Sequence, residues 1–250
     1  MTLVVRHDGP MPGQWLMDRD SDDLKAAANS EIEARLSLYQ WEVPTLSLGF
    51  HQVDSKVDFE RLKTAGVPLV RRPTGGAAVL HSEELTYSIV VPDVVELRAG
   101  QYLLEYVGRA ISEGLQAIGV NAELDERGES LSPLANRTSC FARTSRWEVA
   151  VDGRKIVGSA QRRLGNALLQ HGSILLGNDH LRIVEFLTVS QETDRESLRS
   201  RLDKKATCVE NEIGQGNHAK ELRHALETAF QSGYDSFLKR VNHVNDAVEQ

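Results

Sequence analysis

Cysteine is scarce in this chain, and so are long apolar segments. The 250 residues include only two cysteines, Cys140 and Cys208, which lie far apart and form neither a CxxC pair nor a Cys/His metal-ligand spacing. No stretch approaches about 18 consecutive apolar residues, so no transmembrane helix is predicted, and residues 1–8 lack the pattern of a signal peptide. These absences predict a cytoplasmic protein with free thiols, without a metal and without a membrane partner.

Positive charge is also in deficit over the whole chain. The sequence has 29 Lys and Arg against 36 Asp and Glu, a formal net charge of −7, which argues against nucleic acid or an anionic membrane as a general partner. Basic residues are instead concentrated near the motifs described below, which predicts a positive mouth on an acidic body. These basic residues are Arg71, Arg72, Arg143, Arg146, Arg154, Lys155, Arg162 and Arg163.

The length and the composition suit one compact domain. Apolar residues make up 40% of the chain and charged residues 26%, which are ordinary values for a globular protein. We expect a single domain over residues 1–250, with a core from about residue 30 to about residue 235 and a short C-terminal tail.

Apolar spacing and turn residues predict a mixture of helices and strands. Helices are predicted over residues 21–38, 54–65 and 101–118 and from residue 181 onward. Strands are predicted over residues 44–49, 67–72, 84–91 and 147–176. The pattern indicates an α+β fold, a mixed sheet with helices on one side.

The last predicted strand segment contains a hairpin. Residues 152–153, Asp-Gly, are typical of a tight turn between two strands. This turn places Ala150 opposite Lys155 and puts Val149 and Ile156 together on the other face.

The most informative motif is RRPTGGAAVLH, at residues 71–81. Arg71 and Arg72 have planar guanidinium groups whose N–H donors can bind carboxylate, phosphate or polar carbonyl groups. Gly75 and Gly76 let the backbone bend sharply and let a ligand approach its N–H groups. A glycine pair alone is more often a simple turn, but a glycine turn after a buried strand is a common small-molecule site.

Two further motifs follow, GRKIVGSAQR at residues 153–162 and LQHGSIL at residues 169–175. The three motifs, in this order, resemble the family of lipoate-protein ligases and octanoyltransferases, whose catalytic fold is shared with biotin protein ligases. The resemblance runs from about residue 45 to about residue 176. It implies a mixed, mostly antiparallel sheet with helices packed on it.

Cys140 is the candidate nucleophile. A cysteine is most often a small, buried, inert hydrophobe. Cys140, however, lies in sequence among Arg137, Arg143 and Arg146, and positive neighbours stabilise a thiolate. The resemblance is closest to the cysteine-dependent octanoyltransferases, in which a cysteine before the hairpin carries the acyl group. Cys140 matches that cysteine, and Lys155 matches the lysine that is thought to lower its pKa and to hold the acyl carbonyl.

The resemblance implies that the remaining motif residues bind the substrate. A lone histidine is more often structural than functional, but His81 and His171 each belong to a motif. The run at residues 158–160 either packs tightly in a sheet or leaves room for a thin acyl chain. The expected substrate-binding residues are Arg71, Arg72, Thr74, Gly75, Gly76, Ala77, His81, Gly158, Ser159, Ala160, Gln161, His171 and Gly172.

The implied activity is an octanoyltransferase of protein lipoylation. It would move an octanoyl group from acyl carrier protein to a lysine of a lipoyl domain or of glycine-cleavage H protein, through a thioester on Cys140 and without a cofactor. Three alternatives stay open: an ATP-dependent lipoate-protein ligase, an amidotransferase with octanoylated H protein as donor, and a non-catalytic binding module. Ala77 counts against the ligase, because it takes the place where the ligase loop usually has a third glycine or a related small-residue pattern. The transferases often have an arginine at this position, so Ala77 departs from their pattern as well and the donor stays open.

Overall fold

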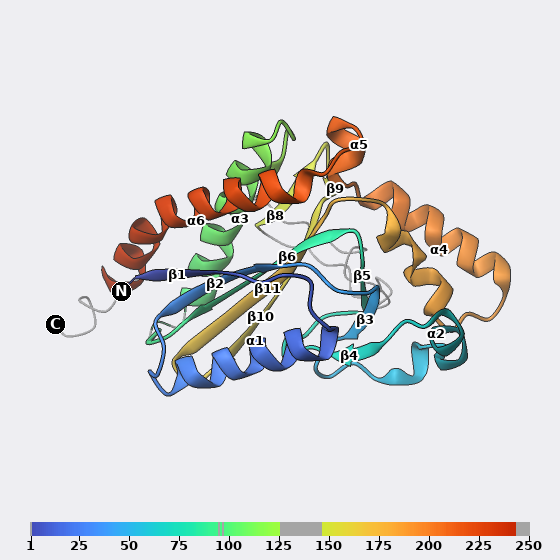
Figure 1. Cartoon of the computed structure of the whole chain (residues 1–250), viewed down its shortest axis with the longest axis horizontal. Helices are drawn as coiled ribbons and strands as arrows, with labels where there is room; N and C mark the ends of the chain where they lie inside the picture. The colour runs from blue at the N-terminus through green and yellow to red at the C-terminus, as the bar shows by residue number, and fades with distance from the viewer. Residues whose placement is uncertain (1, 95, 97, 126–146, 244–250) are drawn as a thin grey trace.

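The computed structural model describes residues 2–94, 96, 98–125 and 147–243 (Figure 1). The strands are β1 (Leu3–His7), β2 (Ala34–Tyr39), β3 (Thr45–Leu48), β4 (Leu69–Arg71), β5 (Val79–His81), β6 (Glu84–Val91), β7 (Glu123–Asp125), β8 (Glu148–Val151), β9 (Arg154–Lys155), β10 (Val157–Leu164) and β11 (Ala167–Leu175). The α-helices are α1 (Gly13–Ala28), α2 (Phe59–Ala65), α3 (Ala99–Ala117), α4 (Glu192–Lys205), α5 (Val209–Ile213) and α6 (His218–His243), and the 3-10 helices are η1 (Asp54–Lys56) and η3 (Asp179–Phe186). None of the helices described here combines the length and the apolar character needed to cross a membrane.

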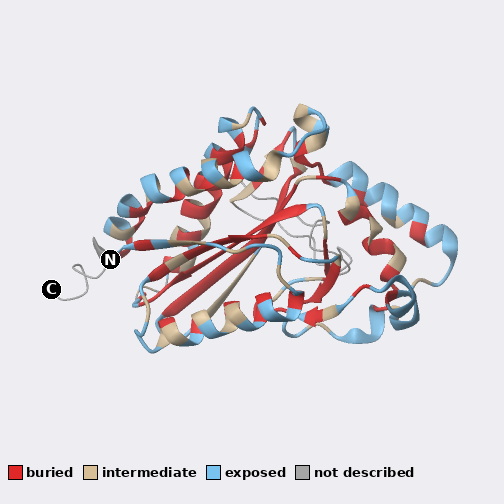
Figure 2. Cartoon of the chain, in the orientation of Figure 1, coloured by how far each residue is buried: buried red, intermediate tan, exposed pale blue. Residues whose placement is uncertain are grey.

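A five-stranded sheet with the order β1-β2-β6-β11-β10 forms the centre of the fold. β1 and β2 run parallel, and the other three pairings are antiparallel. Every residue of β6 and β11 is buried (Figure 2). Two smaller sheets, β4-β3-β5 and β7-β8-β9, complete the mixed, mostly antiparallel α+β fold, as the sequence predicted.

Helices cover both faces of the central sheet, so the expectation of helices on one side is wrong. On one face, Ile89 of β6 shares a core cluster with Leu103 of α3 and Phe230 of α6. On the other face, Val90 packs with Leu24 of α1, and the two helical layers are visible above and below the sheet in Figure 1. Successive strand residues point to opposite faces, so a strand that is buried along its whole length, such as β6, requires cover on both faces.

The predicted helix over residues 21–38 is also wrong in its bounds, because the segment divides into the end of α1 and all of β2. The chain leaves α1 through Ser30, whose φ of 56° is not helical. Beyond it, Ala34, Leu36 and Leu38 are fully buried at every second position. That period of two belongs to a strand, and pairing with β1 and β6 fixes it there.

The hairpin prediction is confirmed. Both residues of the turn at 152–153 have positive φ, Ala150 faces Lys155 in the ladder, and the Ile156 N–H donates to the Val149 carbonyl at 3.2 Å. Val149 and Ile156 both enter the main core. The hairpin thus orients Lys155 relative to the start of β10.

The small sheet β4-β3-β5 presents the first motif. β4 ends at Arg71 and β5 begins at Val79, so residues 72–78 form the connecting turn. Gly76 has a φ of 101°, which favours glycine. Gly49, directly after β3, passes so close to the Gly76 carbonyl that a Cβ at residue 49 would collide with it. We call residues 72–78 the glycine turn.

Candidate active site

One small cavity, of about 30 Å³, brings the three sequence motifs together. It is lined by Met17, Tyr39, Trp41, Arg72, Val79, His81, Thr86, Gly158, Ser159, Ala160, His171, Gly172 and Ser173. A second cavity among the described residues, of about 260 Å³, lies between α3 and α6 and contains none of the motif residues. The cavity at the motifs is therefore the candidate active site.

Seven of the predicted site residues line this cavity. The lining group is Arg72, His81, Gly158, Ser159, Ala160, His171 and Gly172. Those that do not line it are Arg71, Thr74, Gly75, Gly76, Ala77, Lys155 and Gln161. The predicted nucleophile Cys140 lies outside the described residues.

Arg72 organises the glycine turn from inside. Its side chain is buried, and its guanidinium donates to the Gly75 carbonyl at 2.8 Å, to the Ala77 carbonyl at 2.7 Å and to Ser47 Oγ at 3.1 Å. Arg71 points elsewhere and donates to the Gly49 carbonyl at 2.8 Å and to an Asp54 carboxylate oxygen at 2.5 Å. The two arginines of the motif therefore support different loops.

The carbonyl groups of the glycine turn are held by the protein. Besides the two that Arg72 binds, the Pro73 carbonyl accepts from Arg162 at 2.9 Å and the Thr74 carbonyl from the Phe50 N–H at 2.8 Å. In the part of the chain that the structure describes, the N–H groups at residues 75–77 donate to no protein partner. The carbonyl groups of the turn therefore bind protein donors, while the N–H groups at residues 75–77 are left to donate to a ligand.

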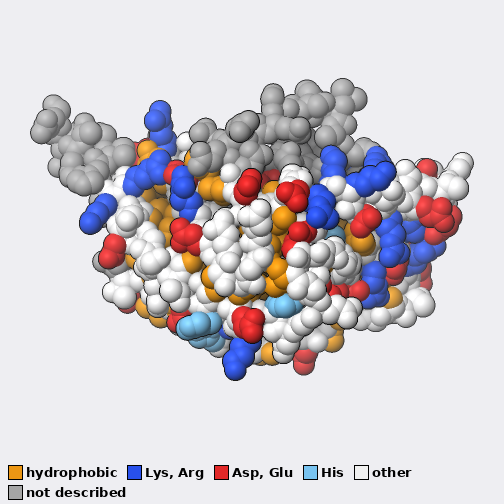
Figure 3. Space-filling view, turned by 90° about the horizontal axis from the view of Figure 1, so that it is seen from above, with side chains coloured by type: hydrophobic (Ala, Val, Ile, Leu, Met, Phe, Trp, Pro, Cys, Tyr) orange, Lys and Arg blue, Asp and Glu red, His pale blue; other side chains and the backbone are white. Residues whose placement is uncertain are grey.

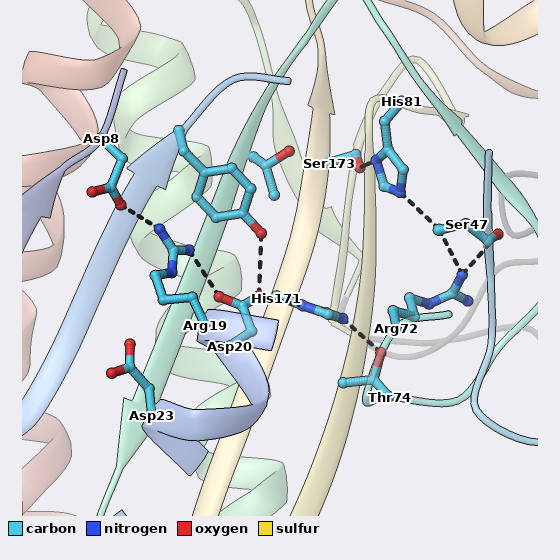
Figure 4. Close-up of polar contacts among 12 residues, drawn as sticks. Asp8, Arg19, Asp20, Asp23, Ser47, Arg72, Thr74, His81, His171 and Ser173 are labelled. Carbon is cyan, nitrogen blue, oxygen red and sulfur yellow. Dashed lines mark hydrogen bonds and ion pairs between the residues drawn. The ribbon is translucent and has the colours of Figure 1, made fainter. Parts of the chain in front are cut away.

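His81 forms the centre of a buried hydrogen-bond chain that we call the Glu84 chain. His81 Nδ1 lies 2.8 Å from Glu84 Oε1. His81 Nε2 lies 2.7 Å from Ser47 Oγ (Figure 4). The imidazole also stacks on Trp41, with ring centroids 3.9 Å apart. Thr86 and Ser173 donate to the same oxygen Oε1 of Glu84, while Oε2 is buried without a partner among the described residues.

His171 forms the centre of a second chain, the Asp20 chain. His171 Nδ1 lies 2.9 Å from Asp20 Oδ2, and His171 Nε2 lies 2.6 Å from Thr74 Oγ1 (Figure 4). Asp20 also accepts from the Tyr39 hydroxyl at 3.1 Å and from Arg19 at 2.8 Å. Sequence analysis missed Asp20, because α1 carries four aspartates and no pattern separates this one from the rest.

The electrostatics of the Asp20 chain favour a neutral His171 beside an ionised Asp20. Burial lowers the pKa of His171 and outweighs the raising effect of Asp20. Burial alone would raise the pKa of Asp20, but its hydrogen bond to His171 and the charge of Arg19 lower it below its ordinary value. His171 therefore donates from Nδ1 to Asp20 and accepts at Nε2 from the Thr74 hydroxyl.

Two glycines and a tyrosine shape the wall formed by β10 and β11. A Cβ at Gly172 would collide with the Gly158 carbonyl and the Tyr87 ring, so the wall needs glycine there. The Tyr87 hydroxyl lies 2.7 Å from Ser159 Oγ, and burial raises the pKa of Tyr87 to about 12. Gln161 does not line the cavity; it ties β10 to α3, because its amide donates to the Gly100 carbonyl at 3.0 Å.

Lys155 is buried on β9, beside β8. Its Nζ lies 2.7 Å from Glu148 Oε1, so the ammonium has a carboxylate partner. The Lys155 carbonyl accepts from the Thr207 N–H at 2.9 Å, which ties β9 to the segment before α5.

The predicted positive mouth is partly neutralised in the described part of the chain. Carboxylates pair with Arg71, Lys155 and Arg154, the last with Glu212 at 2.9 Å. Arg72, Arg162 and Arg163 each donate to backbone carbonyls. On the face seen in Figure 3, basic and acidic side chains are interspersed. Arg143 and Arg146 lie outside the described residues.

Comparisons with known proteins agree with the motifs. A family model described as the lipoyl protein ligase A/B catalytic domain matches residues 17–231. The chain is 37% identical over 246 residues to octanoyltransferase LipM of Kyrpidia tusciae, covering 95% of this chain and 89% of the relative. It is 36% identical to octanoyltransferase LipM of Carboxydothermus hydrogenoformans, covering 85% and 79%.

A solved structure shares the fold. It is that of a bipartite lipoate protein ligase and its E2 lipoyl domain from Thermoplasma acidophilum, with a TM-score of 0.69 at 21% identity, covering 94% of this chain and 83% of that chain. This likeness shows that the five-stranded sheet and its helices are arranged as in that protein.

Proposed function

The chain belongs to the lipoyl protein ligase A/B catalytic-domain family, and on that premise we propose that it is an octanoyltransferase of protein lipoylation. The observation that carries the proposal is the 37% identity, over 95% of the chain, to a relative named as an octanoyltransferase. Glycine and alanine in the cavity wall leave the backbone open to a thin acyl chain, although a whole octanoyl chain needs more room than the 30 Å³ that the cavity has in this structure. Burying about seven methylene groups contributes roughly 5 kcal/mol.

In the first half-reaction, the thiolate of Cys140 attacks the thioester carbonyl of an octanoyl carrier protein. A carbon–sulfur bond to Cys140 forms, the bond to the carrier sulfur breaks, and the carrier leaves as a thiol after taking up a proton. The Lys155 ammonium stabilises the thiolate. The N–H groups at residues 75–77, which donate to no described protein group, stabilise the oxyanion.

In the second half-reaction, the ε-amine of a lysine on an acceptor lipoyl domain attacks the acyl-enzyme. A carbon–nitrogen bond forms, the bond to the Cys140 sulfur breaks, and the amine proton passes to the departing thiolate. The chemistry requires neither a nucleotide nor a metal. We propose acyl carrier protein as the donor, a lipoyl domain or glycine-cleavage H protein as the acceptor, and the cytoplasm as the location.

Intact-mass measurement after mixing the protein with octanoyl carrier protein tests the first half-reaction. We expect a mass increase of one octanoyl group on the wild type and on Cys208→Ala, and none on Cys140→Ala. Cys208 is the matched control because it is a buried thiol whose pKa burial raises. An adduct that persists in Cys140→Ala would refute the thioester mechanism.

The same preparation separates the alternatives. Apo lipoyl domain is incubated with octanoyl carrier protein, with octanoylated H protein, or with free lipoate, each with and without ATP. Transfer from the carrier protein without ATP supports the proposal. Transfer only from octanoylated H protein indicates an amidotransferase, transfer only from lipoate with ATP a ligase, and binding without transfer a non-catalytic module.

A further inference from the structure

The glycine turn is attached to α1, a helix that belongs to none of the three motifs. The attachment runs from Thr74 in the turn, through His171 on β11, to Asp20 on α1. All three side chains are buried, with 0%, 5% and 1% of their surface exposed. These hydrogen bonds therefore join the loop that would face the reacting carbonyl to α1, by way of β11 of the central sheet.

The position of the proton is defined in both hydrogen bonds of His171. Asp20 already accepts from Arg19 and Tyr39, and as an ionised carboxylate it can only accept from His171 Nδ1. His171 Nε2 is left as an acceptor, and the Thr74 hydroxyl is the donor that it meets. The Thr74 carbonyl accepts from the Phe50 N–H, so the side chain and the backbone of residue 74 are both held.

We propose that Asp20 is a positioning residue, which fixes the tautomer of His171 and through it holds Thr74 and the glycine turn in place for acyl transfer. The proposal deepens the octanoyltransferase function and rests on it for its catalytic part. Asp20 touches no reacting atom; its effect is on where the N–H groups at residues 75–77 point. A misplacement of about 1 Å in such donors lowers a rate by roughly 100-fold.

A measurement on the unmodified protein tests the tautomer. Nitrogen-15 NMR of the imidazoles at neutral pH is expected to show His171 with its proton on Nδ1. A proton on Nε2 would overturn the proposal, because Thr74 would then have to accept and Asp20 would lose its donor.

Hydrogen exchange at the Phe50 amide tests the positioning without any assay of activity, because this N–H donates to the Thr74 carbonyl of the turn. Asp20→Ala should speed exchange of the Phe50 amide by about 10-fold or more. The matched control is Asp23→Ala, one turn along the same helix, where the lost carboxylate binds Arg6 and Arg35 and not the turn. Equal exchange of the Phe50 amide in both variants would refute the positioning role.

A double-mutant cycle then tests whether Asp20 acts through Thr74. Thr74→Val keeps the volume but removes the hydroxyl, and Thr74→Ser restores it. Asp20→Ala and Thr74→Val should each lower kcat by about 30-fold with less change in KM, and the double variant should lose no more than either alone. Thr74→Ser should retain most of the rate.

Independent losses of kcat in the two variants would contradict a coupling of Asp20 and Thr74 through the Asp20 chain. A double variant slower by the product of the two losses, or a Thr74→Ser variant as slow as Thr74→Val, would show that the two residues act separately. If the wild type transfers no octanoyl group, the proposed function fails, and the tautomer and exchange results still decide the positioning role.

Discussion

The Asp20 chain and the Glu84 chain contain the same three kinds of group in different surroundings. Each has a histidine between a carboxylate and a hydroxyl, and both histidines line the same cavity. The Asp20 carboxylate uses both oxygens and has the Arg19 cation beside it. The Glu84 carboxylate receives its donors on Oε1, while Oε2 has no partner among the described residues.

The cation in the Glu84 chain is at the opposite end. Arg72 donates to Ser47 Oγ at 3.1 Å, and Ser47 lies 2.7 Å from His81. Since Ser47 has one proton and accepts from Arg72, it can donate that proton to His81. The cation of the Asp20 chain, Arg19, therefore lies on α1, outside the glycine turn. The cation of the Glu84 chain, Arg72, belongs to the turn itself.

Replacing Arg72 should have the largest effect, because this residue holds the turn and also ends the Glu84 chain. Arg72→Lys cannot reach all three acceptors, and each buried acceptor left unmet costs about 1–3 kcal/mol. We expect a fall of about 3 kcal/mol in the free energy of unfolding, measured by urea denaturation. Arg71→Lys is the control and should cost no more than about 1 kcal/mol, since its ion pair with Asp54 is exposed. Similar losses in the two variants would contradict the division of roles.

Neutralising Asp20 and Glu84 should destabilise the protein to different extents. Asp20→Asn places an amide donor against either Arg19 or His171 and should lower the free energy of unfolding by about 3 kcal/mol. Glu84→Gln can direct its amide to the side where Oε2 has no described partner, and should cost only about 1 kcal/mol. Urea denaturation of both variants provides the measurement. A larger loss in Glu84→Gln would mean that the Glu84 chain depends on charge more than its contacts indicate.

Removing a tyrosine hydroxyl should have a smaller effect. Tyr39→Phe deletes a buried hydrogen bond to the charged Asp20, worth about 1.5–3 kcal/mol. Tyr87→Phe deletes bonds to the neutral groups of Ser159 and Gln170, and should cost about 1 kcal/mol. The two losses are compared by thermal and urea unfolding, and a reversed order would argue against an ionised Asp20.

Acidification should give the smallest effect, with a definite sign. The pKa of His171 is lower in the folded protein than its ordinary value of 6.5, so the unfolded chain takes up the proton first as the pH falls. The contribution of His171 is complete above about pH 6.5 and is lost as the pH falls toward its folded pKa. His171→Gln, which keeps a donor and an acceptor but does not titrate, should flatten the fall in unfolding free energy between about pH 6.5 and pH 5.

The remaining slope in that variant has a known source. His180 is also buried, and burial lowers its pKa. Its contribution to the free energy of unfolding is therefore also lost as the pH falls. An unchanged slope in His171→Gln would show that His171 does not titrate on folding in this range.

Much of the fold could be predicted because its signals are local. A turn at residues 152–153 with positive φ sets the β8–β9 register by itself, and Gly66 ends α2 in the left-handed conformation. The strand predicted from the loose alternation at residues 84–91 has the bounds of β6, Glu84–Val91. The boundary between α1 and β2 was missed, because the alternation at residues 34–38 gains its meaning only from pairing with β1 and β6.

The candidate site divides in the same way. The motifs predicted Arg72, His81 and His171, and all three line the cavity. Trp41 and Asp20 belong to no motif, since a ring that stacks on His81 and a carboxylate that binds His171 are defined by contacts across the fold.

By itself, the sequence determined the residue types and their order along the chain: the glycines that allow the turn, the paired arginines and the family to which the motifs belong. Only the tertiary structure decided that one arginine of the pair is buried beneath the turn, and that a helix 151 residues away from His171 supplies its carboxylate. The reason is that a hydrogen bond has a range of about 3 Å and an orientation. The number of residues between two groups does not reveal whether the packing of the fold brings them within that range.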